Sequence, residues 1–213
     1  GLHKRIALKI VSYVGTSPGG IIAGFMVATA FLSMWISNTA TTIMMFAVGL
    51  SVIDFISEKA PDRIQVRNFG VALMLGIAYS ASIGGVGTLI GTPPNALLAS
   101  FLESSYRIQI DFFTWMQLGV PVVLVMLPIA WALLTRLIFP VRELNIGDAS
   151  GVIGREIAGL GPMSKGEKAV AIVFICAALG WILRNQLVAL TGLPINDTAI
   201  AITAATVLFA WPI

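Results

Sequence analysis

Two short polar motifs lie inside long uncharged stretches and supply groups that could bind ions. The motif Ser37-Asn38-Thr39 lies near the middle of residues 20–53, thirty-four residues without Asp, Glu, His, Lys or Arg. The motif Gly91-Thr92-Pro93-Pro94-Asn95 lies in a second such stretch, residues 68–102. Hydroxyl, amide and unwound carbonyl oxygens suit a small cation, whereas free N–H groups at a helix start suit an anion. The sequence therefore predicts a ligand site at these motifs.

The composition identifies an integral membrane protein built from helices. The chain is 57% hydrophobic and 11% charged, with a mean hydropathy of +0.93, whereas an average soluble domain is about 25% charged. Its formal charge of +3 does not imply nucleic-acid binding, because the basic residues flank apolar stretches. Cys176 is the single cysteine and His3 the single histidine of the sequence, which predicts neither an intramolecular disulfide nor a histidine-rich metal site.

The first uncharged stretch is too long for one membrane crossing. A single helix of thirty-four residues would be about 51 Å long, whereas about 20 residues span the hydrocarbon. Division at the polar tip gives two arms of about 24 Å each, Ile21–Ile36 and Thr41–Ile56. We therefore expect a re-entrant helical hairpin over residues 20–57, with its tip lining a cavity. Ser33 lies four residues before Ser37 and is expected on the same helix face.

The second stretch is expected to form a broken transmembrane helix over residues 69–110. Four glycines and two prolines between Gly84 and Pro94 cannot continue an α-helix. Thr92 as N-cap and Pro93 at the first helical position would start the second half-helix. Asn38 or Thr39 would similarly cap the second arm of the hairpin. Both helix starts would carry partial positive charge within the membrane.

The remaining segments complete a multi-span layout. Residues 1–19 are expected to form an interfacial amphipathic helix (Leu2–Val14) and a turn, and Glu58–Asn68 an inner loop. Residues 111–168 are expected to form a span at Asp111–Phe139 followed by a cytoplasmic interfacial segment, Val141–Lys168. Two further spans are expected within residues 169–213, at Ala169–Leu190 and Asp197–Ile213. Eleven basic residues flank one side of this layout and two the other. We expect the protein in the plasma membrane, and the positive-inside rule then orients it with loops 54–68 and 139–168 in the cytoplasm. Arg184 and Asp197 are expected to reach the interface by snorkelling.

The absence of charge within both long stretches narrows the chemistry. Proton-coupled carriers usually have a titratable group inside the membrane, and an intramembrane enzyme needs a nucleophile with a base or paired carboxylates. Neither is present in residues 20–53 or 68–102. An anionic substrate would instead be neutralised by helix dipoles and by co-bound cations, which favours sodium coupling and a transporter rather than an enzyme.

The paired motifs resemble those of the divalent anion:sodium symporter family, carriers of di- and tricarboxylates. The resemblance rests on Ser37-Asn38-Thr39, Ser82-Ile83-Gly84-Gly85 and Gly91–Asn95. It implies one repeat of an inverted-repeat, elevator-type carrier that is a homodimer when full length. A second Ser-Asn-Thr motif is absent from the sequence, so the chain is expected to hold the first repeat and the opening of a truncated second one. The implied sodium ligands are Ser33, Ser37, Asn38 and Gly91, and the implied substrate contacts are Asn38, Thr39, Thr92 and Pro93, with no cofactor besides sodium as the coupling ion.

Several alternatives stay open at this point. Ser37-Asn38-Thr39 could be a polar contact between membrane helices, and the glycine-rich segment could be a packing surface or a hinge. An anion channel would use a similar constriction, and a sodium-independent dicarboxylate exchanger would share the family motifs. The sequence does not separate succinate, malate, fumarate and citrate.

Overall fold

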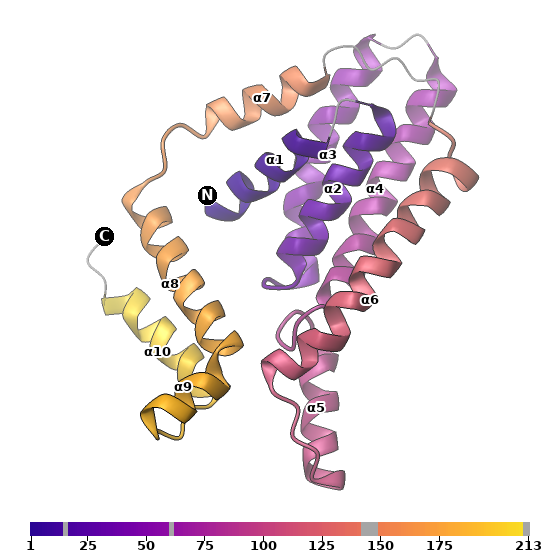
Figure 1. Ribbon diagram of the computed structural model, residues 1–213. Coiled ribbons are helices and arrows are strands. Elements are labelled where there is room, and N and C mark those ends of the chain that lie inside the picture. The colour runs from indigo at the N-terminus through magenta and orange to yellow at the C-terminus, as the bar shows by residue number, and fades with distance from the viewer. Residues whose placement is uncertain (15–16, 60–61, 142–148, 211–213) are drawn as a thin grey trace.

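The computed structural model describes residues 1–14, 17–59, 62–141 and 149–210, and in these residues all regular structure is helical (Figure 1). The elements in chain order are α1 (Leu2–Val14), α2 (Pro18–Ser33), α3 (Asn38–Lys59), α4 (Arg63–Gly85), α5 (Pro93–Tyr106), α6 (Phe112–Ala132), the π-helical segment η1 (Leu133–Ile138), α7 (Ala149–Gly159), α8 (Lys165–Ile182), α9 (Arg184–Thr191) and α10 (Asp197–Ala210).

Helices α1 to α4 form the N-terminal bundle, which contains most of the buried core. Phe25 of α2 and Phe69 of α4 are completely buried. Helices α2 and α4 approach so closely at Gly84 that a Cβ atom there would lie 2.5 Å from the Cα of Ala30. Only glycine allows this approach, which fixes the C-terminal end of α4 beside the end of α2.

The basic N-terminal segment forms α1 with the predicted bounds, Leu2–Val14. Its apolar positions recur at helical spacing, and Leu8 and Val11 are buried in the bundle core. Helix α7 lies across the same end of the bundle and contacts α1 and α3 (Figure 1). The segment predicted to be interfacial therefore packs on both the hairpin and α7.

Within the described part of the chain, three helical segments are long and apolar enough to cross a membrane: Asn38–Glu58 in α3, Arg63–Gly85 in α4, and Phe112–Ile138 across α6 and η1. The α8–α9 pair gives a fourth if it is one bent span. The predicted fold class, an all-α multi-span membrane protein, is confirmed. It includes a helical hairpin, α2–α3, and a helix interrupted between α4 and α5.

The hairpin and its connection to α4 differ from the expected boundaries. Helix α3 has 22 residues and is about 33 Å long, so its second arm is longer than the sixteen residues expected. Helix α4 already begins at Arg63, because the carboxylate of Asp62 accepts hydrogen bonds from the backbone N–H groups of Ile64 and Gln65 and caps it. The expected inner loop Glu58–Asn68 is therefore mostly helical in the described residues.

The expected span Ala169–Leu190 is bent at Leu183, where the chain leaves the helical conformation (φ −97°, ψ 12°). Helices α8 and α9 meet there at an angle of 77°. Helix α10 begins at Asp197 as predicted and ends at Ala210, and residues 211–213 lie outside the described part. Helices α8, α9 and α10 form one group, the α8–α10 unit, beside the bundle (Figure 1).

Candidate functional site

The Ser-Asn-Thr motif lies at the turn between α2 and α3. Helix α2 ends at Ser33, and α3 begins at Asn38. The residue that caps α3 is Ser37, whose Oγ accepts a hydrogen bond from the Ala40 N–H at 3.4 Å. The prediction that Asn38 or Thr39 caps this helix is therefore wrong. Ser37 precedes both residues and leaves their side chains available for other contacts.

Three oxygen atoms converge behind this turn. The Ser33 side chain is completely buried, and its Oγ lies 2.6 Å from Asn38 Oδ1 and 2.7 Å from the Ala81 carbonyl oxygen. Because a hydroxyl has one hydrogen, it donates to only one of these acceptors at a time. The other oxygens keep free lone pairs, which gives this point the character of a neutral oxygen site. Ser37 does not share a helix face with Ser33, because α2 ends between them.

The interruption between α4 and α5 is held in shape by a buried amide. Helix α5 begins at Pro93 and Thr92 is its N-cap residue, as predicted. Thr92 has extended backbone, but its side chain makes no capping hydrogen bond. Asn95 Nδ2 donates to the carbonyl oxygens of Gly85 and Thr88, at 2.8 Å each. A Cβ at Gly91 would lie 2.5 Å from the Gly85 oxygen. The unwound segment therefore folds back tightly on the end of α4.

The two turns are tied to each other and to α6. Thr88 Oγ1 donates to the Met34 carbonyl oxygen in the hairpin turn. Trp115 Nε1 donates to the Val86 carbonyl oxygen at 2.9 Å, so α6 supports the interruption. Thr88 and Asn95 were not among the predicted site residues. Their signal in the sequence is that both are polar and lie in the glycine- and proline-rich break.

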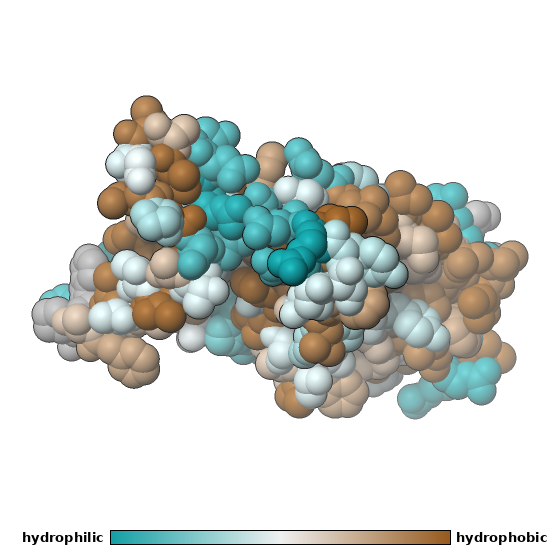
Figure 2. Space-filling model, turned by 90° about the horizontal axis from the view of Figure 1, so that it is seen from below, coloured by the Kyte–Doolittle hydropathy of each residue, from teal (hydrophilic) through white to brown (hydrophobic). Residues whose placement is uncertain are grey.

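A cavity of about 460 Å³ lies beside both turns. One wall contains four predicted site residues, Ser37, Gly91, Thr92 and Pro93. The opposite wall comes from the α8–α10 unit and includes Trp181, Asp197 and Thr198. Seen from the end of the molecule that carries α5 and α9, hydrophilic residues gather across the middle of the surface, between hydrophobic areas (Figure 2).

The structure divides the predicted site residues into two groups and one outlier. Ser33 and Asn38 meet at the buried oxygen cluster, whereas the cavity is lined by the four residues named above. Thr39 is exposed one position beyond Asn38 and does not line this cavity. The ligand roles of all seven residues stay predictions.

Charged residues stand at the edge of the opposite wall. Arg184 donates to Asp111 Oδ2 at 3.1 Å and to Asp197 Oδ1 at 3.2 Å. Burial raises the pKa of Asp111, but hydrogen bonds from Thr114 and the charge of Arg184 outweigh this effect and lower the pKa below its ordinary value. The sequence did not predict that Arg184 and Asp197 bind each other. The expectation that both reach the membrane interface stays a prediction.

Comparison with known proteins gives the same family as the motifs. The family described as "Sodium:sulfate symporter transmembrane region" matches residues 1–213, the whole chain. The chain belongs to the divalent anion:sodium symporter family. It is a family of transporters rather than enzymes.

Curated relatives of this symporter family are similar over almost the whole chain. A sodium-dependent dicarboxylate transporter, SdcS, of Staphylococcus saprophyticus subsp. saprophyticus is 40% identical over 191 residues, which cover 87% of this chain and 36% of the relative. The protein of the same name from Staphylococcus aureus strain USA300 is 37% identical over 216 residues, which cover 99% of this chain and 42% of the relative. The chain thus spans about two fifths of the length of these relatives.

Proposed function

We propose that the full-length protein is a sodium-coupled symporter of dicarboxylates, within the wider class of di- and tricarboxylates. The observation that carries this proposal is the convergence of Ser33 Oγ, Asn38 Oδ1 and the Ala81 carbonyl oxygen beside a cavity lined by the second motif. The names of the relatives, sodium-dependent dicarboxylate transporters, support the choice of ion and substrate.

Both motifs contribute residues to the sodium site and to the substrate site. Sodium is held by neutral oxygens of Ser33, Ser37 and Asn38 and by the backbone at Gly91, because a small hard cation prefers oxygen ligands. The substrate carboxylate is held by Asn38, Thr39, Thr92 and Pro93, the sites implied by the family motifs. The starts of α3 and α5 add partial positive charge near the anion. Asn38 joins the two sites, which gives a physical route for coupling ion binding to substrate binding.

The orientation in the membrane follows from the basic residues. Lys4 and Arg5 of α1 bind Glu156 of α7 and Glu167 of α8, so these helix ends lie together. The positive-inside rule favours placing this end, with loops 54–68 and 139–168, in the cytoplasm. An elevator-type movement and a homodimer, which the family resemblance implies, belong to the same proposal.

The test is uptake of radiolabelled succinate by the full-length protein in liposomes. An inward sodium gradient should drive accumulation, and an equal potassium gradient should not. Uptake that needs only internal dicarboxylate and ignores sodium would favour the exchanger. Flux without counterflow would favour a channel. Either result would contradict symport.

Substitutions at the first motif test the site within the same assay. Asn38→Ala and Thr39→Ala should each abolish uptake while the protein still inserts and elutes as a single species. Thr42→Ala, on the same helix, serves as the matched control because Thr42 lies one turn beyond the motif. Normal uptake by correctly inserted Asn38→Ala protein would reject the site.

A further inference from the structure

Arg184 joins two carboxylates that come from different helices. It is the first residue of α9, at the bend after α8. One guanidinium nitrogen binds Asp111, which caps α6, and another binds Asp197, which begins α10. The three side chains are named here the α6 clasp. The residues are separated by 73 and 13 positions in the sequence.

Every carboxylate oxygen in the α6 clasp has a partner. Besides its bond to Arg184, Asp111 accepts a hydrogen bond from the Thr114 N–H at 2.7 Å. Asp197 accepts a second bond from the Phe112 N–H at 3.0 Å. Asp197 thereby binds the first turn of α6 directly as well as through Arg184. Each carboxylate oxygen already has a protein donor and Arg184 supplies the positive charge, so the geometry is that of a connection between helices rather than of a cation site.

The α6 clasp connects two parts of the molecule, the bundle side and the α8–α10 unit. Asp111 and Phe112 belong to α6, which packs on α2 and α4 of the bundle. Arg184 and Asp197 belong to the α8–α10 unit, where α9 and α10 pack chiefly on α8 and contain no buried residue. The apolar part of the junction is a small aromatic group, in which Phe112 stacks on Trp181 at 4.9 Å.

One residue of the α6 clasp, Asp197, lines the candidate cavity, as do the neighbouring Phe112 of α6 and Trp181 of α8. Trp181 and Asp197 belong to the wall opposite Thr92 and Pro93. The distance between the two walls is therefore set where the α6 clasp lies. We propose that Arg184, Asp111 and Asp197 act as positioning residues that hold the two walls together in this conformation and separate when ligand enters or leaves the cavity. This inference rests on the proposed function for the identity of that ligand.

The chemistry of the α6 clasp suits a contact that forms and breaks. Arg184 is 25% exposed, and Asp111 and Asp197 are 16% and 24% exposed. Water can reach these groups, so the separated charges would be hydrated rather than left bare in a dry interior. In a purely apolar junction of the same size, hydration of the separated surfaces would not offset the free-energy cost of opening.

The experiment measures the distance between the two walls in the full-length protein in liposomes. Spin labels are attached at Gln117→Cys in α6 and Gln186→Cys in α9, both exposed, in a Cys176→Ser background. Arg184→Gln and Arg184→Lys are compared with Arg107→Asn. Arg107 is exposed and has positive φ, which asparagine tolerates.

With Arg184 present and no ligand, we expect one narrow distance distribution. Arg184→Gln should raise the population of a longer distance about tenfold, since it removes two charge-assisted hydrogen bonds. Arg184→Lys should be intermediate, and Arg107→Asn should leave the distribution unchanged. An unchanged distribution in both Arg184 variants, or the same shift in Arg107→Asn, would overturn the proposal. Because the distances are measured without substrate, they test the α6 clasp even if the protein shows no sodium-driven uptake.

Discussion

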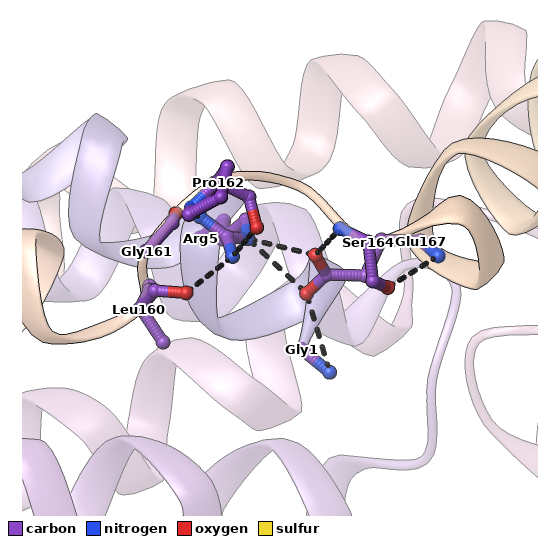
Figure 3. A network of polar contacts seen from close by, with 7 residues as sticks. All are labelled: Gly1, Arg5, Leu160, Gly161, Pro162, Ser164 and Glu167. Atoms are coloured by element: carbon purple, nitrogen blue, oxygen red, sulfur yellow. Dashed lines mark hydrogen bonds and ion pairs between the residues drawn. The ribbon is translucent and has the colours of Figure 1, made fainter.

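Phe25 and Phe69 of the N-terminal bundle are completely buried, whereas no residue of α9 or α10 is buried. The bundle is held by apolar packing and close backbone approach. The α8–α10 unit is attached at both ends by charged side chains. At one end lies the α6 clasp. At the other, Arg5 of α1 binds both carboxylate oxygens of Glu167, at 3.0 and 3.1 Å, as Figure 3 shows.

This difference indicates that one wall of the candidate cavity is rigid and the opposite wall is adjustable. The wall that carries the Ser-Asn-Thr and Gly-Thr-Pro-Pro-Asn motifs belongs to the densely packed side, so its oxygen atoms are held in place. The opposite wall is attached by a small aromatic group and by ion pairs, and the ion pairs can exchange their partners for water. A carrier needs both properties, because the ligand must be bound accurately and also released.

The largest expected effect comes from the close approach of α2 and α4. Gly84→Ala should destabilise the full-length protein by more than about 3 kcal/mol, because the added methyl group meets the Ala30 backbone and neither helix can yield. Thermal unfolding followed by size-exclusion chromatography measures this. Gly154→Ala in α7 is the control, since a Cβ there meets nothing within 4 Å and should be neutral or slightly stabilising. Equal thermal stability of the two variants would contradict the claim that the bundle side is rigidly packed.

A smaller loss is expected at the interruption between α4 and α5. Asn95→Ala removes two buried hydrogen bonds and leaves the Gly85 and Thr88 carbonyl oxygens without this donor. We expect a loss of about 2 kcal/mol in unfolding free energy, measured by thermal unfolding. Ser100→Ala, at an exposed position of α5, should change little. Wild-type stability of Asn95→Ala would show that the amide does not support the break.

Ser33→Ala tests the oxygen cluster with a milder change. Loss of its hydrogen bond should cost about 1 kcal/mol in stability, and the sodium concentration needed for half-maximal uptake should rise severalfold. Ser82→Ala is the control, because its hydroxyl is exposed and makes only a long bond, at 3.5 Å, to Ala78. An unaltered sodium dependence in Ser33→Ala would remove this hydroxyl from the proposed sodium site.

The smallest effect is expected at the partly exposed ion pair between Lys4 of α1 and Glu156 of α7. Lys4→Gln should cost less than about 1 kcal/mol, and hydrogen exchange should become faster in α7 while α2 and α4 stay protected. The difference in exchange rate between the variant and the wild type should become smaller at high salt, because salt screens the ion pair of the wild type. Lys9→Gln, on the same helix, is the control because Lys9 makes none of the ion pairs seen in the described residues. Faster exchange throughout the bundle would contradict a boundary between the two regions.

The sequence predicted the local features of the site well, because they follow from the conformational preferences of neighbouring residues. Glycine and proline content gave the interruption before Pro93, and the apolar spacing gave α1. The end of α2 at Ser33 was not predicted, since Met34, Trp35 and Ile36 are apolar residues that could continue a helix. The turn there is fixed by a tertiary contact, from Thr88 to the Met34 carbonyl oxygen.

The α6 clasp was beyond sequence reasoning for a different physical reason. Asp111, Arg184 and Asp197 each lie beside an apolar stretch, where a charged residue most simply reaches water. Their pairing depends on the bend at Leu183, which directs Arg184 toward α6. A bend of that kind depends on partners far along the chain. The role of Asn95 could not be predicted either, because the sequence does not show whether its amide binds a ligand or the backbone carbonyl oxygens of Gly85 and Thr88.

The most direct test of the central claim is binding of radioactive sodium to the purified full-length protein, measured without transport. The wild-type protein and Thr42→Ala should bind sodium, and binding should tighten when succinate is added. Asn38→Ala should lose both sodium binding and its enhancement by succinate while remaining folded. Sodium binding by folded Asn38→Ala at wild-type strength would contradict the claim that the two polar turns form the shared ion and substrate site.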